Sequence, residues 1–363
     1  MQENDSEQKL AAFRCRMTWP YEAKLRHAQH TAEKFKEIIE ADYESNVHVS
    51  VGGLDSITLL TFLRERCHMD VPAISVSCLE DRSIQIIHKQ LGVIPLQPKK
   101  NKVEVIREFG WPVLSKEIAG KISLLQNPSP QNATVRHAII TGETGEYGGN
   151  RTGTRMKMAD KWLELFGGPE NEAEGVHYQT APFKVSDKCC YYLKEKPCDE
   201  WAKEHYSYPY LGLMASEGGR RTKALMLNGC NYISDTTKRS APFAIFSRQD
   251  ILQLALDLHV PVPEIYGKIE TAADGTLFTT GAQRTGCSMC GFGVHMEQRP
   301  HRFDQLRERN PKEWDFWMHH VMQDENGEWY GWGRVLDYIG VEWEDDPFGN
   351  ISGQTDLFGG EVE

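Results

Sequence analysis

Cysteines at two places along the chain could together hold one inorganic cofactor. Cys189 and Cys190 are adjacent, and Cys287 and Cys290 stand at the ends of a Cys-Ser-Met-Cys sequence. A [4Fe–4S] cluster needs four thiolates that converge on one point, and an adjacent pair plus a Cys-x-x-Cys supplies them. Zinc takes the same sulfur ligands, but its structural sites usually use two Cys-x-x-Cys-like pairs. The spacing therefore favours an iron–sulfur cluster over zinc, and over four unrelated buried thiols.

A glycine-rich turn lies between an expected strand and an expected helix. Residues 47–51 are rich in β-branched side chains and predict a buried strand, Gly52 and Gly53 end it, and residues 57–63 continue as a helix. Glycines let the backbone approach an anion, and a helix N-terminus offers N–H groups with a positive dipole. Ser56 can cap that helix and donate its hydroxyl to a phosphate or sulfate. The turn is not a Walker loop, because that spacing and its lysine are missing.

Composition limits the class of protein. The 363 residues are 40% hydrophobic and 26% charged, which is typical of a globular protein. The formal charge of −11, from 41 basic and 52 acidic residues, disfavours a broad nucleic-acid-binding surface and leaves nucleic acid an open question. The polar N-terminal sequence and the lack of a stretch of about 18 apolar residues predict a cytoplasmic protein with no membrane partner. In a reducing cytoplasm, clustered cysteines are metal ligands more often than disulfides.

Strands and helices alternate along the first half of the chain. Strands are expected at residues 47–51, 73–77, 92–96 and 138–141, and a further one at 228–234. This alternation predicts an α/β fold with a parallel twisted sheet and helices on both faces. Such sheets bind ligands at the carboxyl ends of their strands, so Thr141 and Gly142, at the end of the fourth strand, should line the same crevice as the glycine turn.

Three consecutive segments are expected. Residues 1–45 form an N-terminal helical segment, residues 46–265 the nucleotide-binding α/β domain, and residues 266–363 a cluster-bearing C-terminal extension with a helical, tryptophan-rich tail.

Several separated segments resemble one family. Residues 51–56 resemble the S-G-G-x-D-S loop of pyrophosphatase-loop proteins, and residues 186–194 followed by Pro197 resemble the cluster segment of the phosphoadenosine phosphosulfate (PAPS) reductase family. Iron–sulfur members of that family, the adenosine phosphosulfate (APS) reductases, combine a Cys-Cys pair with a distant Cys-x-x-Cys, as here. Residues 212–221 resemble the family's substrate-arginine segment, and residues 242–252 a stretch that precedes a helix. The resemblance covers residues 47–302 and identifies the chain as a member of a divergent branch of this family.

The resemblance implies an adenine nucleotide alpha hydrolase-like fold, a [4Fe–4S] cluster, and ATP or a related adenine nucleotide as ligand. The implied cluster ligands are Cys189, Cys190, Cys287 and Cys290. The implied nucleotide-binding residues are Ser50, Gly52, Gly53, Asp55, Ser56, Thr141 and Gly142. The implied catalytic residues are Lys194, which matches a family lysine between cluster and bound anion; Arg221, which matches an arginine that grips a phosphate or sulfate; and Asp55, a candidate ligand for Mg²⁺.

The chain departs from the family pattern at positions that bear on activity. Val51, Met214 and Gly218 stand where the pattern has a serine, an arginine and a serine. Sulfonucleotide reductases attack the sulfate sulfur with a thiolate near the C-terminus, but Cys290 is the last cysteine here and is needed as a ligand. We therefore do not expect thioredoxin-dependent reduction of PAPS or APS.

Three functions remain open at this stage. The first is an enzyme of sulfur metabolism that carries out ATP-dependent sulfur transfer, or cleavage at the nucleotide α-phosphate, on an unknown acceptor with a sulfur donor or modification-system protein as partner. The second is an APS or PAPS reductase with an atypical nucleophile. The third is a non-catalytic nucleotide- or cluster-sensing subunit of a phage, defence or DNA-modification system. The intact loop and cysteine motifs favour the first, whereas the oligomeric state is open.

Overall fold

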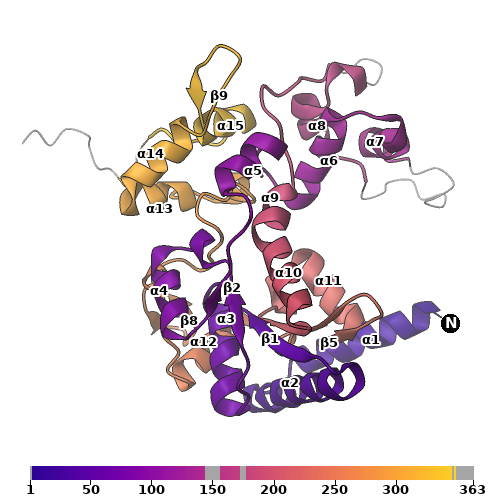
Figure 1. The fold of residues 1–363 in the computed structure, drawn as a ribbon, viewed down its shortest axis with the longest axis vertical. Coiled ribbons are helices and arrows are strands. Elements are labelled where there is room, and N and C mark those ends of the chain that lie inside the picture. The colour runs from indigo at the N-terminus through magenta and orange to yellow at the C-terminus, as the bar shows by residue number, and fades with distance from the viewer. Residues whose placement is uncertain (1, 144–155, 172–176, 346, 349–363) are drawn as a thin grey trace, which may run out of the picture. The chain divides into compact units, whose positions relative to one another are not determined.

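The computed structural model describes residues 2–143, 156–171, 177–345 and 347–348, with backbone alone for residues 2–6 and 219–221. The chain divides into two compact units. The sheet unit comprises Met1–Lys99 and Leu193–Ser288, and the helical unit comprises Lys100–Tyr192 and Met289–Glu363. The units therefore interleave along the chain, whereas the sequence analysis expected three consecutive segments (Figure 1).

The sheet unit is built on a six-stranded sheet with the order β3-β2-β1-β4-β6-β5. All neighbouring strands pair in parallel except β5, which is antiparallel to β6. The expected α/β class with a mostly parallel sheet is confirmed. The strands are β1 (Asn46–Ser50), β2 (Ala73–Ser75), β3 (Ile94–Pro95), β4 (Ser207–Leu211), β5 (Asn231–Ile233) and β6 (Lys238–Ser240).

Helices and a small hairpin complete the sheet unit. A core that includes Phe35, Ile57, Tyr210 and Phe243, each fully buried, lies within this unit. α12 begins where Ser247 and Asp250 form a reciprocal capping box, which satisfies two N–H groups at its start. The helices are α1 (Gln2–Met17), α2 (Tyr21–Tyr43), α3 (Leu54–Thr61), α4 (Arg82–Gln90), α10 (Lys196–Glu204), α11 (Gly219–Asn228) and α12 (Arg248–Asp257); the hairpin strands are β7 (Ile269–Thr271) and β8 (Leu277–Thr279).

The helical unit has a separate core. Trp111, Phe303 and Trp332 are fully buried in it, and the rings of Trp111 and Trp332 meet edge to face with centroids 4.7 Å apart. The unit therefore buries its own apolar surface. Its helices are α5 (Lys102–Phe109), α6 (Lys116–Gln126), α7 (Ala133–Thr141), α8 (Asp160–Phe166), α9 (Lys188–Cys190), α13 (Arg302–Arg309), α14 (Pro311–His319) and α15 (Trp332–Ile339); its strands are β9 (Met322–Gln323) and β10 (Trp329–Tyr330).

The strand expected at residues 138–141 is wrong. These residues end helix α7, in which Thr141 Oγ1 donates to the carbonyl oxygen of His137 over 2.8 Å, and Gly142 ends the helix in the left-handed conformation. A short apolar run does not distinguish a strand from a buried helix by periodicity. Thr141 and Gly142 were included in the nucleotide site because a sheet strand was expected to end there. They end a helix instead, so that reason for including them is wrong.

Strand β4 was not expected, because Pro209 interrupts its sequence. Proline lacks an N–H group and is usually excluded from central strands. β4 pairs along its whole length with β1. With β6 it pairs only through Tyr210 and Ser240, so few backbone hydrogen bonds join β4 to β6.

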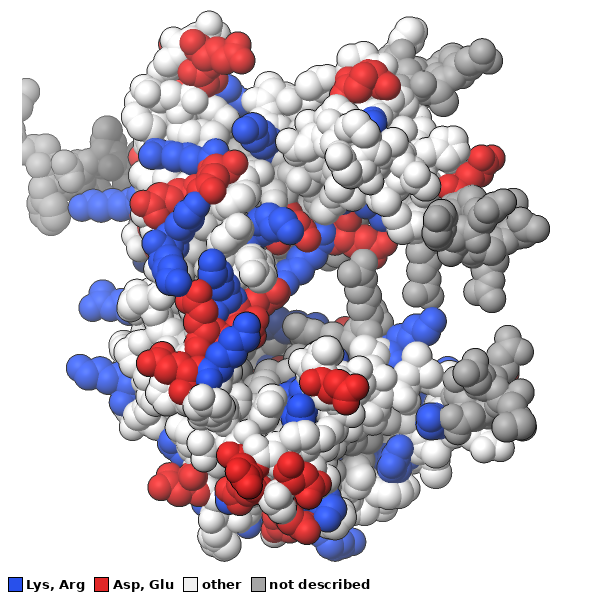
Figure 2. Space-filling view, turned by 45° about the vertical axis from the view of Figure 1, so that its right-hand side comes forward, with Lys and Arg blue, Asp and Glu red and all other residues white. Residues whose placement is uncertain are grey.

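Charged side chains of both signs intersperse on the face drawn in Figure 2, without a continuous basic surface in that view. Within the described part of the chain, no helix combines the length and the apolar character needed to cross a bilayer.

Candidate functional site

The strand order of the sheet reverses direction at β1. β2 and β3 follow β1 on one side, and β4 and β6 lie on the other. Ligands of open α/β sheets bind outside the carboxyl ends of the strands at such a switch point. The turn with Gly52 and Gly53 follows β1 there, and Gly212 directly follows β4, whose Leu211 pairs with Ser50. The glycine turn thus lies where this architecture places ligands.

Gly212 lets the two loops approach closely. A Cβ placed on Gly212 would lie 2.9 Å from Cα of Ser56, a backbone contact that cannot be relieved by a side-chain rotation. Any other residue at this position would push the segment after β4 away from the start of α3. The close approach brings the loops after β1 and β4, which are far apart in sequence, into one site.

Hydrogen bonds inside the glycine turn fix its shape. The Gly52 N–H donates to Ser56 Oγ over 2.7 Å, and Ser56 Oγ donates to the Gly53 carbonyl over 2.8 Å. Ser56 was expected to cap the helix, but it is the third residue of α3, the N-cap position is Gly53, and the Ser56 hydroxyl instead closes the turn.

Buried His88 orients one peptide of the turn. Burial lowers the pKa of His88, so its ring is neutral, and Nε2 lies 2.8 Å from the Gly52 carbonyl oxygen while Nδ1 lies 2.9 Å from Ser77 Oγ. A neutral ring that donates from Nε2 and accepts at Nδ1 satisfies both contacts. Because C=O and N–H point in opposite directions across a trans peptide, the Gly53 N–H is directed away from His88.

Lys194 lies beside this turn, between the carboxylate of Glu80 and Cys287. Its Nζ donates to Glu80 Oε1 over 2.5 Å, and that oxygen would be 3.7 Å from a Cβ on Gly52. Burial alone would lower the pKa of Lys194, but the charges of Cys287 and Glu80 and hydrogen bonds to both raise it further than burial lowers it. Ser288 N–H donates to the Leu79 carbonyl over 2.9 Å, which holds Cys287 next to Glu80 along the chain. A fixed positive charge therefore lies against both the turn and Cys287.

A tyrosine and a threonine close the other side of the turn. Tyr266 Oη accepts the Leu54 N–H over 3.0 Å and lies 2.6 Å from Thr285 Oγ1. A Cβ placed on Gly53 would lie 2.2 Å from Tyr266 Oη and 2.7 Å from Thr285 Oγ1, so only glycine fits without displacing them. Because one of these two hydroxyls donates to the other, the pair leaves one O–H group that can donate to an anion at the start of α3.

Asp55, in the first turn of α3, forms an ion pair with Arg248 at the start of α12. Arg248 also donates to the Gln283 carbonyl over 3.1 Å. Burial raises the pKa of Asp55, the charge of Arg248 opposes that effect, and Glu217 adds to it while Arg284 opposes it.

Of the four expected cluster ligands, Cys287 belongs to the sheet unit, and the other three belong to the helical unit. Cys189 is buried and Cys190 is half-buried in α9, and Cys290 precedes Gly291, whose position leaves no room for a side chain because a Cβ would lie 2.1 Å from the Trp332 ring. The carbonyl oxygen of Cys290 accepts from Arg302 over 3.3 Å. Cys290 is therefore held by the packed core of its own unit.

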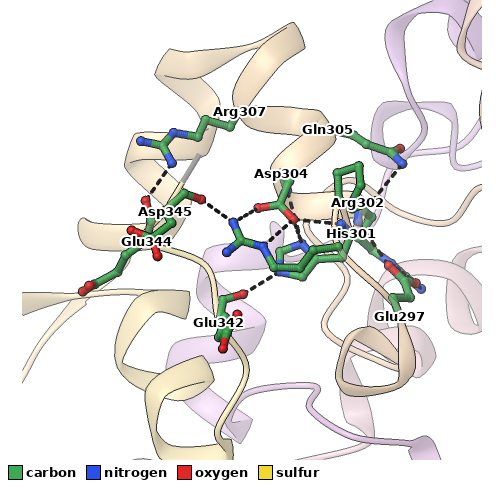
Figure 3. Close-up of polar contacts among 11 residues, drawn as sticks. Glu297, His301, Arg302, Asp304, Gln305, Arg307, Glu342, Glu344 and Asp345 are labelled. Atoms are coloured by element: carbon green, nitrogen blue, oxygen red, sulfur yellow. Dashed lines mark hydrogen bonds and ion pairs between the residues drawn. The ribbon is translucent and has the colours of Figure 1, made fainter. Parts of the chain in front are cut away.

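A polar network holds the segment that follows Cys290 (Figure 3). His301 Nε2 lies 3.0 Å from the Glu342 carbonyl oxygen and its Nδ1 lies 3.0 Å from Asp304 Oδ2, while Arg299 donates to Asp304 Oδ1 over 2.8 Å. His301 and Asp304 are almost fully buried. Both ring nitrogens of His301 are thus engaged within the unit, so this histidine has a structural role.

The four expected ligands fit a cluster by their chemistry. All nine cysteines lie in the described part of the chain, and none forms a disulfide. The lysine next to Cys287 favours the thiolate, which is the form that binds iron. Among the described residues, no three His, Cys, Asp or Glu side chains are arranged as ligands of one metal ion. The shared cluster site of Cys189, Cys190, Cys287 and Cys290 therefore stays a prediction from sequence.

Two of the three positions that differ from the pattern described in the sequence lie in the core. Val51 and Met214 are buried in the core of the sheet unit, with 6% and 1% of their surface exposed. Gly218, with φ of +87°, precedes α11. Arg221 belongs to the first turn of α11, and its side chain lies outside the described residues.

Five residues of this site were missed in the sequence: Glu80, His88, Gly212, Arg248 and Tyr266. Each reaches the turn from a different element, so local spacing carries no signal for it. Gly212 is the exception, because a glycine directly after a strand at the switch point is a recognisable signal.

Comparison of the chain with models of known protein families finds none that matches, and no curated protein matches it either.

Proposed function

We propose that this chain is an adenine-nucleotide-binding, iron–sulfur enzyme of the PAPS reductase type, which carries out ATP-dependent sulfur transfer or cleavage at the nucleotide α-phosphate. The observation that carries the proposal is the glycine turn at the switch point of the sheet, with Lys194 bound to Glu80 beside Gly52. A glycine turn before a helix and a fixed ammonium are complementary to a phosphate chain.

In this proposal the chain's own residues act by placement and charge neutralisation. The Gly53 N–H and the positive end of the α3 dipole are proposed to hold the phosphates, while Ser56, which binds the Gly52 N–H and the Gly53 carbonyl, keeps the turn in shape. Lys194 is the residue proposed to neutralise the charge that develops on the α-phosphate oxygens during displacement, because its ammonium is held by Glu80 beside Gly52. Preorganised charges of this kind usually supply the largest share of catalysis.

Cys189, Cys190, Cys287 and Cys290 are the residues proposed to hold the [4Fe–4S] cluster. When bound, such a cluster supplies a site for sulfur binding or electron transfer. Lys194, which contacts Cys287, links the cluster ligands to the nucleotide turn within the sheet unit.

Five spare cysteines lie outside the two motifs: Cys15, Cys67, Cys78, Cys198 and Cys230. Cys67 is buried and Cys198 and Cys230 are half-buried, which disfavours these three as the atypical nucleophile of the alternative, an APS or PAPS reductase, whereas Cys15 and Cys78 are exposed. Burial raises the pKa of Cys67 to about 12 and those of Cys198 and Cys230 to about 11, and it also raises that of Cys78. A thiol that stays protonated is a poor nucleophile. In addition, Met214 replaces a family arginine and is buried.

The test is anaerobic purification followed by a visible spectrum and an ATP turnover assay. We expect a brown protein that releases pyrophosphate or AMP from ATP. Release of sulfite from APS or PAPS, abolished by replacing one of the spare cysteines, would favour the reductase. A brown protein that binds ATP but turns over neither substrate would favour the non-catalytic sensing subunit.

A further inference from the structure

Asp55 is the residue of the glycine turn best suited to bind Mg²⁺, yet it is already paired with a cation. The side chains of Asp55 and Arg248 are 24% and 27% exposed, so the ion pair is largely shielded from water. Arg248 is also held by the Gln283 carbonyl. An arginine fixed by two partners at the rim of a site has little freedom to leave.

The surroundings of Asp55 are already balanced in charge. Burial raises the pKa of Asp55 and outweighs the opposing charges of Arg248 and Arg284, and Glu217 adds to the rise, so two cationic and two acidic side chains act on one another here. Mg²⁺ binds to carboxylate oxygens in near-ideal octahedral geometry and keeps several waters. To reach Asp55, the hydrated ion would have to displace Arg248 from a partly buried ion pair.

We propose that Arg248 takes the place of a divalent cation at Asp55, so that the site binds its nucleotide without Mg²⁺. This inference rests on the proposed nucleotide-binding function and narrows its substrate to the metal-free nucleotide. The phosphate charge is then neutralised by side-chain cations, of which Arg248 and Lys194 both lie against the turn.

The first test compares ATP binding with and without the metal. Isothermal titration calorimetry of the full chain, purified without oxygen, measures the dissociation constant for ATP in EDTA and in MgCl₂. We expect ATP to bind at least as tightly in EDTA as in MgCl₂. Binding that occurs only in MgCl₂ would overturn this inference and leave the proposed function intact. Absence of ATP binding under both conditions would overturn both.

Two substitutions sharpen the test. Arg248→Gln should weaken ATP binding in EDTA by about tenfold or more, the scale of one charge-assisted hydrogen bond. In MgCl₂ this variant should regain part of the lost affinity, because Asp55 is then free to bind the metal ion. Asp55→Asn removes the only carboxylate proposed for the metal, so the ratio of the dissociation constants in EDTA and in MgCl₂ should stay within about threefold of the ratio for the unaltered chain, about 0.65 kcal/mol. If Asp55 instead holds Mg²⁺, Asp55→Asn will abolish the tighter binding in MgCl₂.

Arg26→Gln is the matched control, because Arg26 is an exposed arginine of α2. It should leave both dissociation constants unchanged. An equal loss of binding in Arg26→Gln and Arg248→Gln would assign the effect to overall charge and contradict the role of Arg248.

Discussion

Replacement of Lys194 by methionine, together with Glu80→Gln, should lower kcat/KM for ATP cleavage by about 10²–10³-fold, the loss typical of removing one preorganised charge from a reaction centre. The two residues must be replaced together. Glu80 has only 4% of its side chain exposed, so Lys194→Met alone would leave a buried carboxylate without its cation. Breaking a buried pair in that way costs about 3–5 kcal/mol of stability and would confuse a loss of activity with a loss of folding.

Steady-state kinetics and thermal melting of the same samples separate these effects. Lys203→Met is the matched control, because Lys203 is an exposed lysine of α10 in the same unit. It should keep both activity and melting temperature. Full ATP cleavage by the Lys194→Met, Glu80→Gln variant would show that the ammonium beside Gly52 has no part in the reaction.

Cys287→Ser should remove most of the bound iron, from about four atoms per chain to below about one, because a cube with three thiolate ligands is less stable than one with four. The visible absorbance of the cluster should fall in parallel. Cys287 is the informative position, since it contacts Lys194 and therefore joins the cluster prediction to the nucleotide turn.

Cys198→Ser is the corresponding control. Cys198 lies in α10, and burial raises its pKa to about 11, so it is not a candidate ligand. Iron analysis of both variants, prepared without oxygen, should separate them clearly. Equal iron in Cys287→Ser and the unaltered chain, or equal loss in both variants, would contradict the assignment of Cys287.

The parts of the fold that sequence predicted are those specified by local pattern. The β-branched run of β1 and the two glycines after it follow from neighbouring residues, and each lies where it was expected, whereas Ser56 lies inside α3 and does not cap it. The helix expected at residues 57–63 is likewise present, as α3 and the π-helical turn Phe62–Arg66 that follows it.

What sequence could not predict depends on tertiary contacts. Residues 138–141 have the apolar character of a strand but end a helix, and Pro209 lies in a strand because its partner on one side pairs at a single position. The groups that shape the glycine turn approach it from elsewhere: His88 from α4, Tyr266 from the segment after α12, and Arg248 from α12 itself. Because these residues are far from Gly52 along the chain, no local sequence pattern predicts that they contact the turn.

Hydrogen–deuterium exchange with and without ATP tests the central claim most directly, because it locates the bound nucleotide without altering the chain. The account predicts that ATP slows exchange in peptides that cover residues 52–56 and 212–217, the loops after β1 and β4. Adenosine, which lacks the phosphates, should not slow exchange in either loop. Unchanged exchange in both loops at saturating ATP, or protection confined to other segments, would contradict a nucleotide site at the switch point of this sheet.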